Sequence, residues 1–395
     1  MGWKNCCVMD ERIKFVGRVL DGESMSSLCR EFGISRKTGY KIFTRYKECG
    51  LEALQDRSRR PVRYGNQLPF QVEKCILRLK QDKPSWGAKK LREKLIRKYP
   101  EVKPPAISTI HAVLDRNGLV VPRGRKRNRA TGTTLSSALN PNDLWCADYK
   151  GQFLLGSKQY CYPLTVTDQA SRYLFAVEAL QSTKEKYAFT IFERVFKEFG
   201  LPNAIRTDNG VPFASPNSLF NLSTLSVWWL RLGIAIERIK PGNPQQNGRH
   251  ERMHLTLKKE ATRPAGQNFL QQQAKFDDFI DEFNNERPHE SLDMKYPSEV
   301  YRESMRAYHG LPELHYPLHD RTINITCCGR ICIGKKKINL SKAFAGQAIG
   351  ITQVADDTWL ASFVDYDLGY FDTESNKFEP LPNPFGVKVL PMSPV

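Results

Sequence analysis

The sequence contains no long hydrophobic run. No stretch in its 395 residues approaches the roughly 18 uninterrupted apolar residues of a membrane helix. The first residues, MGWKNCCVMDERIK, also lack the apolar segment of a secretory signal. We therefore expect a cytoplasmic protein that has no membrane partner.

Zinc-type cysteine patterns are missing as well. Ten cysteines are scattered along the chain, without the C-x-x-C pairs and matched histidines that zinc sites need. We interpret them as free thiols in a reducing compartment. The composition, 40% hydrophobic and 26% charged residues, excludes a disordered or fibrous chain, and the length predicts about two to three domains.

The last two thirds of the chain have no excess of either charge. Residues 131–395 carry 29 basic and 29 acidic side chains, whereas residues 1–130 carry 31 basic and 13 acidic ones. The whole net charge of +18 therefore lies in the first third. Such a block suits a solvated surface, a membrane-surface patch or a nucleic-acid footprint, and the local pattern has to decide between them.

The basic block is predicted to be helical rather than a charged tail. Between Glu11 and Gly50 the apolar residues recur in three short helical bursts separated by turn residues. In SLCREFGISRKTGYKIFTRYK, Gly33 would occupy a tight turn and Ser35 would cap the next helix, which is a helix-turn-helix pattern. We assign residues 1–62 to this domain. The residues that its last helix would offer to a DNA major groove are Ser35, Arg36, Lys37, Thr38 and Lys41.

A second helix-turn-helix domain is predicted over residues 63–122. Helices are expected at Phe70 to Leu79, Ala88 to Arg97 and Ser108 to Asn117, and the extended piece after them suggests a wing. Either unit alone also fits a small bundle that only packs, but two in tandem in so basic a block favour DNA. The candidate DNA contacts in this domain are Ser108, Thr109 and His111.

Residues 123–143 are predicted to be a basic linker, because they are rich in basic residues and then in Thr, Ser, Gly and Asn, with no apolar period. Its basic start would track a DNA backbone between domains, although a plain solvated linker is equally compatible. The candidate contacts here are Arg123, Arg125, Lys126 and Arg127.

From Leu144 the apolar period changes from helical to extended. Three strand-like runs, LWCADYKGQFLL, QYCYPLTVTD and RYLFAVEAL, are joined by short turns and predict an antiparallel trio. A helix with Ser182 and Glu185 as a capping box follows, and then the strand AIRTD, a helix around Leu225 to Leu232, the strand IAIERI and a long helix with Pro244 at its first position. This order predicts a mixed α/β sheet with helices on both faces.

Three acids lie where a catalytic site would need them. Asp148 is in the middle of the first strand, Asp208 ends the fourth, and Glu251 lies about two turns into the long helix. A carboxylate in a buried strand is costly unless it is paired or bound to a metal. Asp168 is a rival acid, for which we favour hydrogen bonding in the turn DQASR or pairing with Arg172.

The long helix carries an acid, an imidazole and an ammonium on one face. Asn247, Glu251, His254 and Lys258 recur at the spacing of a single helix face. Taken alone, this helix fits a solvated stripe of charges with a hydrogen-bonded histidine.

Four sequence strings change that balance. WCADYKG, IRTDNGVPF, KPGNPQQNGRHERMHLTLKKE and FNNERPHESLDMKYPSEVY, in this order, resemble bacterial insertion-sequence transposases with a retroviral-integrase-like catalytic core. The resemblance covers residues 1 to about 305. It implies a ribonuclease-H-like fold for residues 144–306 and a catalytic triad formed by Asp148, Asp208 and Glu251. The 42 residues between Asp208 and Glu251 are more than most relatives have, and we expect the extra length in FASPNSLFNLSTLSVWW.

The resemblance also implies a chemistry. Three converging carboxylates repel one another unless cations neutralise them, and hard oxygen ligands select Mg2+ or Mn2+. Two ions per active site would serve an in-line displacement at phosphorus, with Asp148 bridging both and Asp208 and Glu251 each completing one coordination shell. Water would cut the transposon end, and the exposed 3′-hydroxyl would attack target DNA. His254 and Lys258, on the same helix face as Glu251, would contact the scissile phosphate or the flanking strand. Asn209, Asn247 and Arg249 are further DNA contacts by position only.

Residues 307–395 return to short strand-like runs, which predict a small β barrel or sandwich. In the resembled proteins, a C-terminal β module here is SH3-like. The expected partners are double-stranded DNA, both terminal inverted repeats and target, and further copies of the chain, at least a homodimer, in the bacterial cytoplasm at the nucleoid. The alternative is a catalytically silent relative that binds DNA as a regulator. A nuclease directed at RNA has no support in the sequence.

Overall fold

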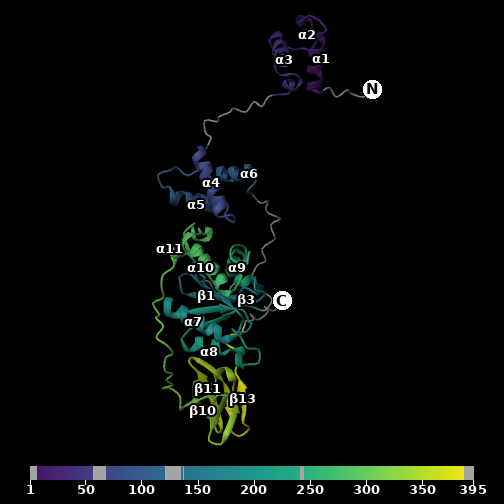
Figure 1. Ribbon diagram of the computed structural model, residues 1–395. Coiled ribbons are helices and arrows are strands. Elements are labelled where there is room, and N and C mark those ends of the chain that lie inside the picture. The colour runs from purple at the N-terminus through teal and green to yellow at the C-terminus, as the bar shows by residue number, and fades with distance from the viewer. Residues whose placement is uncertain (1–6, 57–67, 121–134, 137, 241–243, 387–395) are drawn as a thin grey trace, which may run out of the picture. The chain divides into compact units, whose positions relative to one another are not determined.

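The computed structural model describes residues 7–56, 68–120, 135–136, 138–240 and 244–386 (Figure 1). The chain divides into two compact units, Met1–Pro69 and Phe70–Val395. None of the described helices is long and apolar enough to cross a membrane. The finer domain boundaries inside the second unit stay a prediction.

The first unit is a three-helix bundle. Its helices are α1 (Val8–Leu20), α2 (Met25–Glu31) and α3 (Arg36–Cys49), followed by the 3-10 turn η1 (Leu51–Leu54). Gly33 takes a positive φ of 64° in the turn between α2 and α3, and Ser35 Oγ accepts the Thr38 amide at 3.2 Å as the N-cap. Phe15 and Leu28 are fully buried between the helices. The predicted helix-turn-helix pattern is confirmed.

The second unit begins with three more helices. They are α4 (Phe70–Asp82), α5 (Ala88–Lys98) and α6 (Ile107–Arg116). Each end lies at most three residues from its predicted position. Ile76, Leu91 and Ile110 form their shared interior, each with no exposed surface. Leu119 and Val120 belong to no strand, and the rest of the predicted wing lies outside the described residues.

A mixed sheet of six strands forms the centre of the second unit. The strands are β1 (Leu144–Tyr149), β2 (Phe153–Leu154), β3 (Tyr160–Asp168), β4 (Leu174–Leu180), β5 (Ala204–Thr207) and β6 (Ala235–Arg238). β3 pairs with both β1 and β4 in antiparallel fashion, while β5 is parallel to β1 and β6 is parallel to β5. The predicted antiparallel trio followed by parallel strands is confirmed.

Helices cover both faces of this sheet (Figure 1). α7 (Glu185–Phe199) and α8 (Thr224–Arg231) pack on one face, and α9 (Gly248–Glu260) and α10 (Phe269–Asp281) pack on the other. Because side chains alternate along a strand, Leu164 and Val166 join the α7 core, whereas Thr165 and Thr167 reach α9. The shorter helices are η2 (Leu219–Asn221), η3 (Pro244–Asn247), η4 (Glu282–Glu286), η5 (Glu290–Leu292), α11 (Pro297–Val300) and η6 (Lys342–Phe344).

Two local predictions about helix starts are wrong. α7 begins at Glu185, and no capping box forms, because the Glu185 carboxylate accepts the Leu225 amide at 2.7 Å instead. α9 begins at Gly248, after Pro244 has opened the 3-10 turn η3. Glu251 is therefore in the first turn of α9, not two turns in.

The C-terminal strands form an open sheet, so the predicted barrel is wrong. β7 (Arg321–Asn324), β10 (Ala348–Ala355), β11 (Thr358–Phe363), β12 (Tyr366–Asp372) and β13 (Lys377–Pro380) make one sheet with β7 and β13 at its edges, and β8 (Arg330–Ile333) pairs only with β9 (Lys336–Asn339). Its apolar residues share one core with Phe220, Leu222, Val227 and Leu230. The sheet thus buries its apolar face against residues 220–230 rather than by closing on itself.

Candidate active site

The sheet places two of the three acids on neighbouring strands. Asp148 lies near the end of β1, and Asp208 directly follows β5. Cys146 pairs with Arg206 across these parallel strands, so two residues further on Asp148 is level with Asp208. Glu251 lies in the first turn of α9, close enough for its charge to act on Asp148.

Burial and the neighbouring acids raise the pKa of Asp148 to about 7. Burial has the largest effect and the charge of Asp208 the next; the charge of Glu251 adds to them, while the Tyr149 amide and Lys150 act in the opposite direction. Burial raises the pKa of Asp208 as well, although its carboxylate accepts the Gly210 amide at 3.2 Å. No lysine or arginine of the described residues forms an ion pair with any of the three.

A polar network that sequence reasoning missed lies beneath Asp148. His250 and His254, four residues apart on the buried side of α9, both contact the Thr165 hydroxyl of β3 through Nε2, each at 2.7 Å. Thr165 Oγ1 also donates to the Asp148 carbonyl at 3.0 Å. His254 Nδ1 is 3.8 Å from Asp148 Oδ2. Burial lowers the pKa of His250 to about 3 and that of His254 to about 2, so both rings are neutral.

The donor set suits a divalent cation. Carboxylate oxygens are the ligands that Mg2+ and Mn2+ favour. The pKa of Asp148 is about 7 because the chain's own groups do not offset the cost of burying its charged form. Asp148, His250 and His254 also offer atoms that lie within 4.8 Å of one another. The residues present therefore fit a metal.

Asp168 has the structural role that we favoured. It is buried, and its carboxylate accepts hydrogen bonds from the Asn142 amide at 2.8 Å and from the amide and hydroxyl of Ser171 at 2.6 Å. These bonds close the DQASR turn. Asp168 thus uses its oxygens within the fold and does not join the other acids.

The predicted DNA contacts fall into three groups. In the first unit, the predicted residues of α3 and its cap are exposed, as are Ser108, Thr109 and His111 on α6. On α9 the predicted shared face is divided, since Asn247 and His254 are buried whereas Glu251 and Lys258 are exposed. Arg249 donates to the Gln169 carbonyl at 3.3 Å, and Asn209 donates to that of Ile239 at 2.6 Å. Arg123, Arg125, Lys126 and Arg127 lie outside the described residues.

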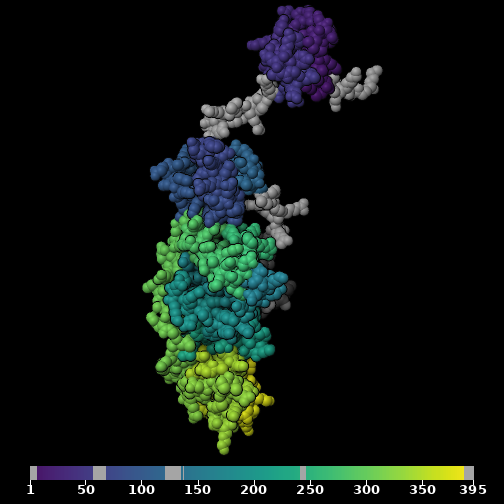
Figure 2. All heavy atoms as spheres, viewed as in Figure 1, coloured from purple at the N-terminus to yellow at the C-terminus, as the bar shows by residue number. Residues whose placement is uncertain are grey.

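Four basic residues of α5 and of the turn before it pair with acids of the core. The ion pairs are Lys83–Glu282 at 2.7 Å, Lys94–Glu286 at 3.0 Å, Arg97–Glu299 at 2.5 Å and Lys89–Glu290. The guanidinium of Arg97 also lies 3.9 Å from the centre of the Tyr296 ring. Figure 2 shows the blue α4–α6 helices against the green segment that holds these acids. Part of the basic charge that we expected on DNA is therefore neutralised within the chain.

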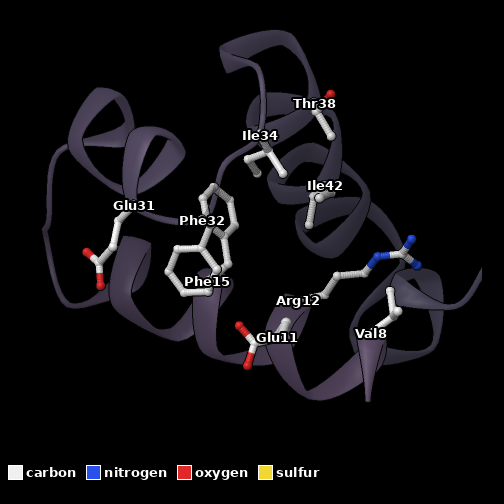
Figure 3. A pocket seen from close by; sticks show the side chains of 9 residues that line it. All are labelled: Val8, Glu11, Arg12, Phe15, Glu31, Phe32, Ile34, Thr38 and Ile42. Atoms are coloured by element: carbon white, nitrogen blue, oxygen red, sulfur yellow. The ribbon is translucent and has the colours of Figure 1, made fainter. Parts of the chain in front are cut away.

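A cavity of about 480 Å³ opens in the first unit and is separate from the acids. Figure 3 shows its lining, in which the rings of Phe15 and Phe32 meet edge to face with their centres 5.5 Å apart. Arg12 at its rim donates to the Leu54 carbonyl at 2.6 Å. The lining is thus made by side chains that already hold the bundle together.

Comparison with known proteins gives the family. A model described as an integrase core domain matches residues 138–244, and another with the same description matches residues 232–297. The chain carries an integrase core. A helix-turn-helix domain model matches residues 11–61, and a homeodomain-like domain model matches residues 38–114.

The relatives of this integrase-core protein include products of bacterial insertion elements. An uncharacterized protein of insertion element IS476 of Xanthomonas euvesicatoria is 24% identical over 58% of the chain and 63% of its own length. One from insertion element IS407 of Burkholderia multivorans is 27% identical over 48% of the chain and 67% of its own length. The chain thus spans about two thirds of these relatives. The predicted resemblance to insertion-sequence proteins with an integrase-like core is confirmed.

One solved structure aligns with part of the chain. The HTLV-2 integrase catalytic core domain in complex with magnesium aligns over 42% of this chain and 100% of its own, with 16% sequence identity and a TM-score of 0.34.

Proposed function

We propose that this integrase-core protein is a DNA transposase that cleaves the ends of its insertion sequence and joins them to target DNA. The observation that carries the proposal is the coupling of Asp148 with Asp208 and Glu251, which come from two adjacent strands and a helix. The relationship to insertion-element proteins supports DNA as the substrate.

The three carboxylates would hold two Mg2+ or Mn2+ ions. Bound ions of this kind neutralise the acids and stabilise charge on the attacking and leaving oxygens of an in-line displacement. The chain's own part is to hold the three carboxylates on rigid elements, and Lys258, exposed on α9, would contact the phosphate backbone nearby.

The first unit would find the DNA. Arg36, Lys37 and Lys41 are exposed on α3, after the tight turn that a helix-turn-helix needs. We propose that they read the terminal inverted repeats of the element. Joining two ends to one target requires at least two copies of the chain, so we further propose a dimer or a larger assembly on paired ends.

The test is a cleavage and joining assay on DNA that bears the inverted repeats flanking the gene. With Mg2+ the full chain is expected to nick this DNA and join it to a plasmid, and Asp148→Asn is expected to bind the DNA without nicking it. Glu193→Gln on α7, half-exposed on the opposite face of the sheet, is the matched control and should cleave normally. If the wild-type chain binds but never cleaves, the silent DNA-binding regulator replaces the transposase.

A further inference from the structure

The Thr165 hydroxyl has three polar neighbours but only one hydrogen. It lies 3.0 Å from the Asp148 carbonyl and 2.7 Å from Nε2 of both His250 and His254. A carbonyl can only accept, so the hydroxyl hydrogen goes to Asp148. The two oxygen lone pairs are then left for the two rings, and each ring must donate from Nε2.

This count determines the tautomer of both histidines. A neutral imidazole carries one N–H, so a ring that donates from Nε2 has a bare Nδ1. His250 places its bare Nδ1 2.8 Å from Thr167 Oγ1, whose hydroxyl donates to it. Both nitrogens of His250 are therefore occupied. His250 supports the site from below and has no atom left for a ligand.

His254 differs because its bare Nδ1 has no hydrogen bond among the described residues. His254 is 7% exposed, and Asp148 Oδ2 lies 3.8 Å from its Nδ1. A lone pair that faces a carboxylate is unfavourable, and a cation between them removes the repulsion. Two ligand atoms that are each about 2.1 Å from one ion can lie up to about 4 Å apart. The observed separation of 3.8 Å lies within that limit.

We infer that His254 Nδ1 is a nitrogen ligand of the divalent cation held by Asp148, and that Thr165 positions it for this role. The inference rests on the proposed function only in placing a cation at Asp148. An imidazole beside carboxylates moves a site away from strictly oxygen-bound ions and towards first-row transition metals. The site should therefore bind Mn2+ more tightly than Mg2+.

The direct test uses Mn2+ with the full wild-type chain. Bound Mn2+ is paramagnetic, so pulsed electron paramagnetic resonance detects a directly coordinated nitrogen, and 15N-histidine labelling shifts that signal if the nitrogen is from histidine. We expect one histidine nitrogen per Mn2+ at the site. Bound Mn2+ with no histidine coupling would overturn the inference, and this readout needs no variant.

Paired variants assign the signal to one residue. His254→Ala should abolish the nitrogen coupling and weaken Mn2+ binding by about 10- to 100-fold, and Thr165→Val should weaken it by a smaller factor within that range. Thr167→Val, which removes only the partner of His250, is the matched control and should keep the coupling. Retention of the coupling in His254→Ala would overturn the assignment.

The two proposals fail in different ways. If the chain binds Mn2+ and cleaves inverted-repeat DNA but shows no histidine coupling, only the ligand role of His254 is wrong. If the chain binds Mn2+ with histidine coupling but never cleaves DNA, the ligand role of His254 is upheld and the transposase proposal is wrong.

Discussion

The second unit contains two groups of acids that are treated in opposite ways. Glu282, Glu286, Glu290 and Glu299 each face a lysine or arginine of α5 or the turn before it. Asp148, Asp208 and Glu251 form no such ion pair among the described residues, and burial followed by the charge of Asp208 raises the pKa of Asp148. We call the first group the paired acids and the second the site acids. Acids that are neutralised within the chain stabilise the fold, whereas acids without an ion pair are suited to bind a cation from solution.

The strongest way to break this comparison is to remove one charge from each group and measure DNA cleavage. Asp208→Asn should lower the nicking rate by roughly 10²- to 10³-fold, because a cation loses a ligand where charge develops. Glu286→Gln removes a charge of the same sign from the paired acids and should leave the rate unchanged. Equal losses in both variants, at equal folded fractions, would mean that the site acids have no special role.

DNA affinity offers the next largest effect, since the cations that face the paired acids should be unavailable to phosphates. Replacing Arg36, Lys37 and Lys41 of α3 by alanine should weaken binding to duplex DNA by about 10- to 100-fold. The slope of log affinity against log salt concentration should fall by the amount expected for the loss of about two to three phosphate contacts. The matched triple variant of α5, at Lys89, Lys94 and Arg97, should bind almost as tightly as the wild type. Fluorescence anisotropy at several salt concentrations measures both.

If the α5 variant loses as much affinity as the α3 variant, the ion pairs open when DNA binds. The basic block would then act as a whole, as the charge count first suggested.

Stability should depend on pH with opposite sign for the two groups. Folding raises the pKa of Asp148 from 3.8 to about 7, so its contribution is most favourable below about pH 4 and is lost as the pH rises through 7. Ion pairing with Lys94 lowers the pKa of Glu286, and pairing with Arg97 lowers that of Glu299, so their contribution is present above pH 4.5 and is lost as the pH falls. In EDTA at pH 8, Asp148→Asn should therefore stabilise the chain, by about 1 to 3 kcal/mol, and Glu286→Gln should not.

Urea unfolding between pH 4 and 8 tests this contrast. Added Mg2+ should flatten the decline of wild-type stability above pH 6, because the bound ion replaces the proton on Asp148. A decline of the same size in Asp148→Asn would assign it to other groups.

Local patterns were enough to predict the elements that position the site. The apolar period predicts buried strands and their ends. It therefore predicted that Asp148 lies within one strand and that Asp208 lies at the end of another. The predictions that failed depend on partners distant in sequence. The Glu185 carboxylate binds the Leu225 amide instead of forming a capping box. The C-terminal strands share a core with Val227 instead of closing into a barrel.

The histidine network was hidden for the same reason. His250 and His254 are visibly four residues apart, but only the antiparallel register places Thr165 beside Asp148 and beneath both rings. The long segment between Asp208 and Glu251 now has a structural use, because Phe220 and Leu222 from it enter the core of the C-terminal sheet. Periodicity predicts which face of an element is buried, but it does not name the partner on that face.

The smallest expected effect tests whether the paired acids hold α4–α6 in place. Arg97→Ala removes the ion pair with Glu299 and the contact with the Tyr296 ring, and should cost about 1 to 2 kcal/mol, because such partly exposed pairs contribute little individually. Lys98→Ala, one residue further along α5, removes an exposed charge that makes no ion pair among the described residues and should be neutral. Hydrogen exchange would locate the change: faster exchange in α5 and around Tyr296, with the amides of β1 and β3 unaffected, is expected. Faster exchange in β1 instead would mean that the paired acids also support the site, and the two groups would no longer be separable.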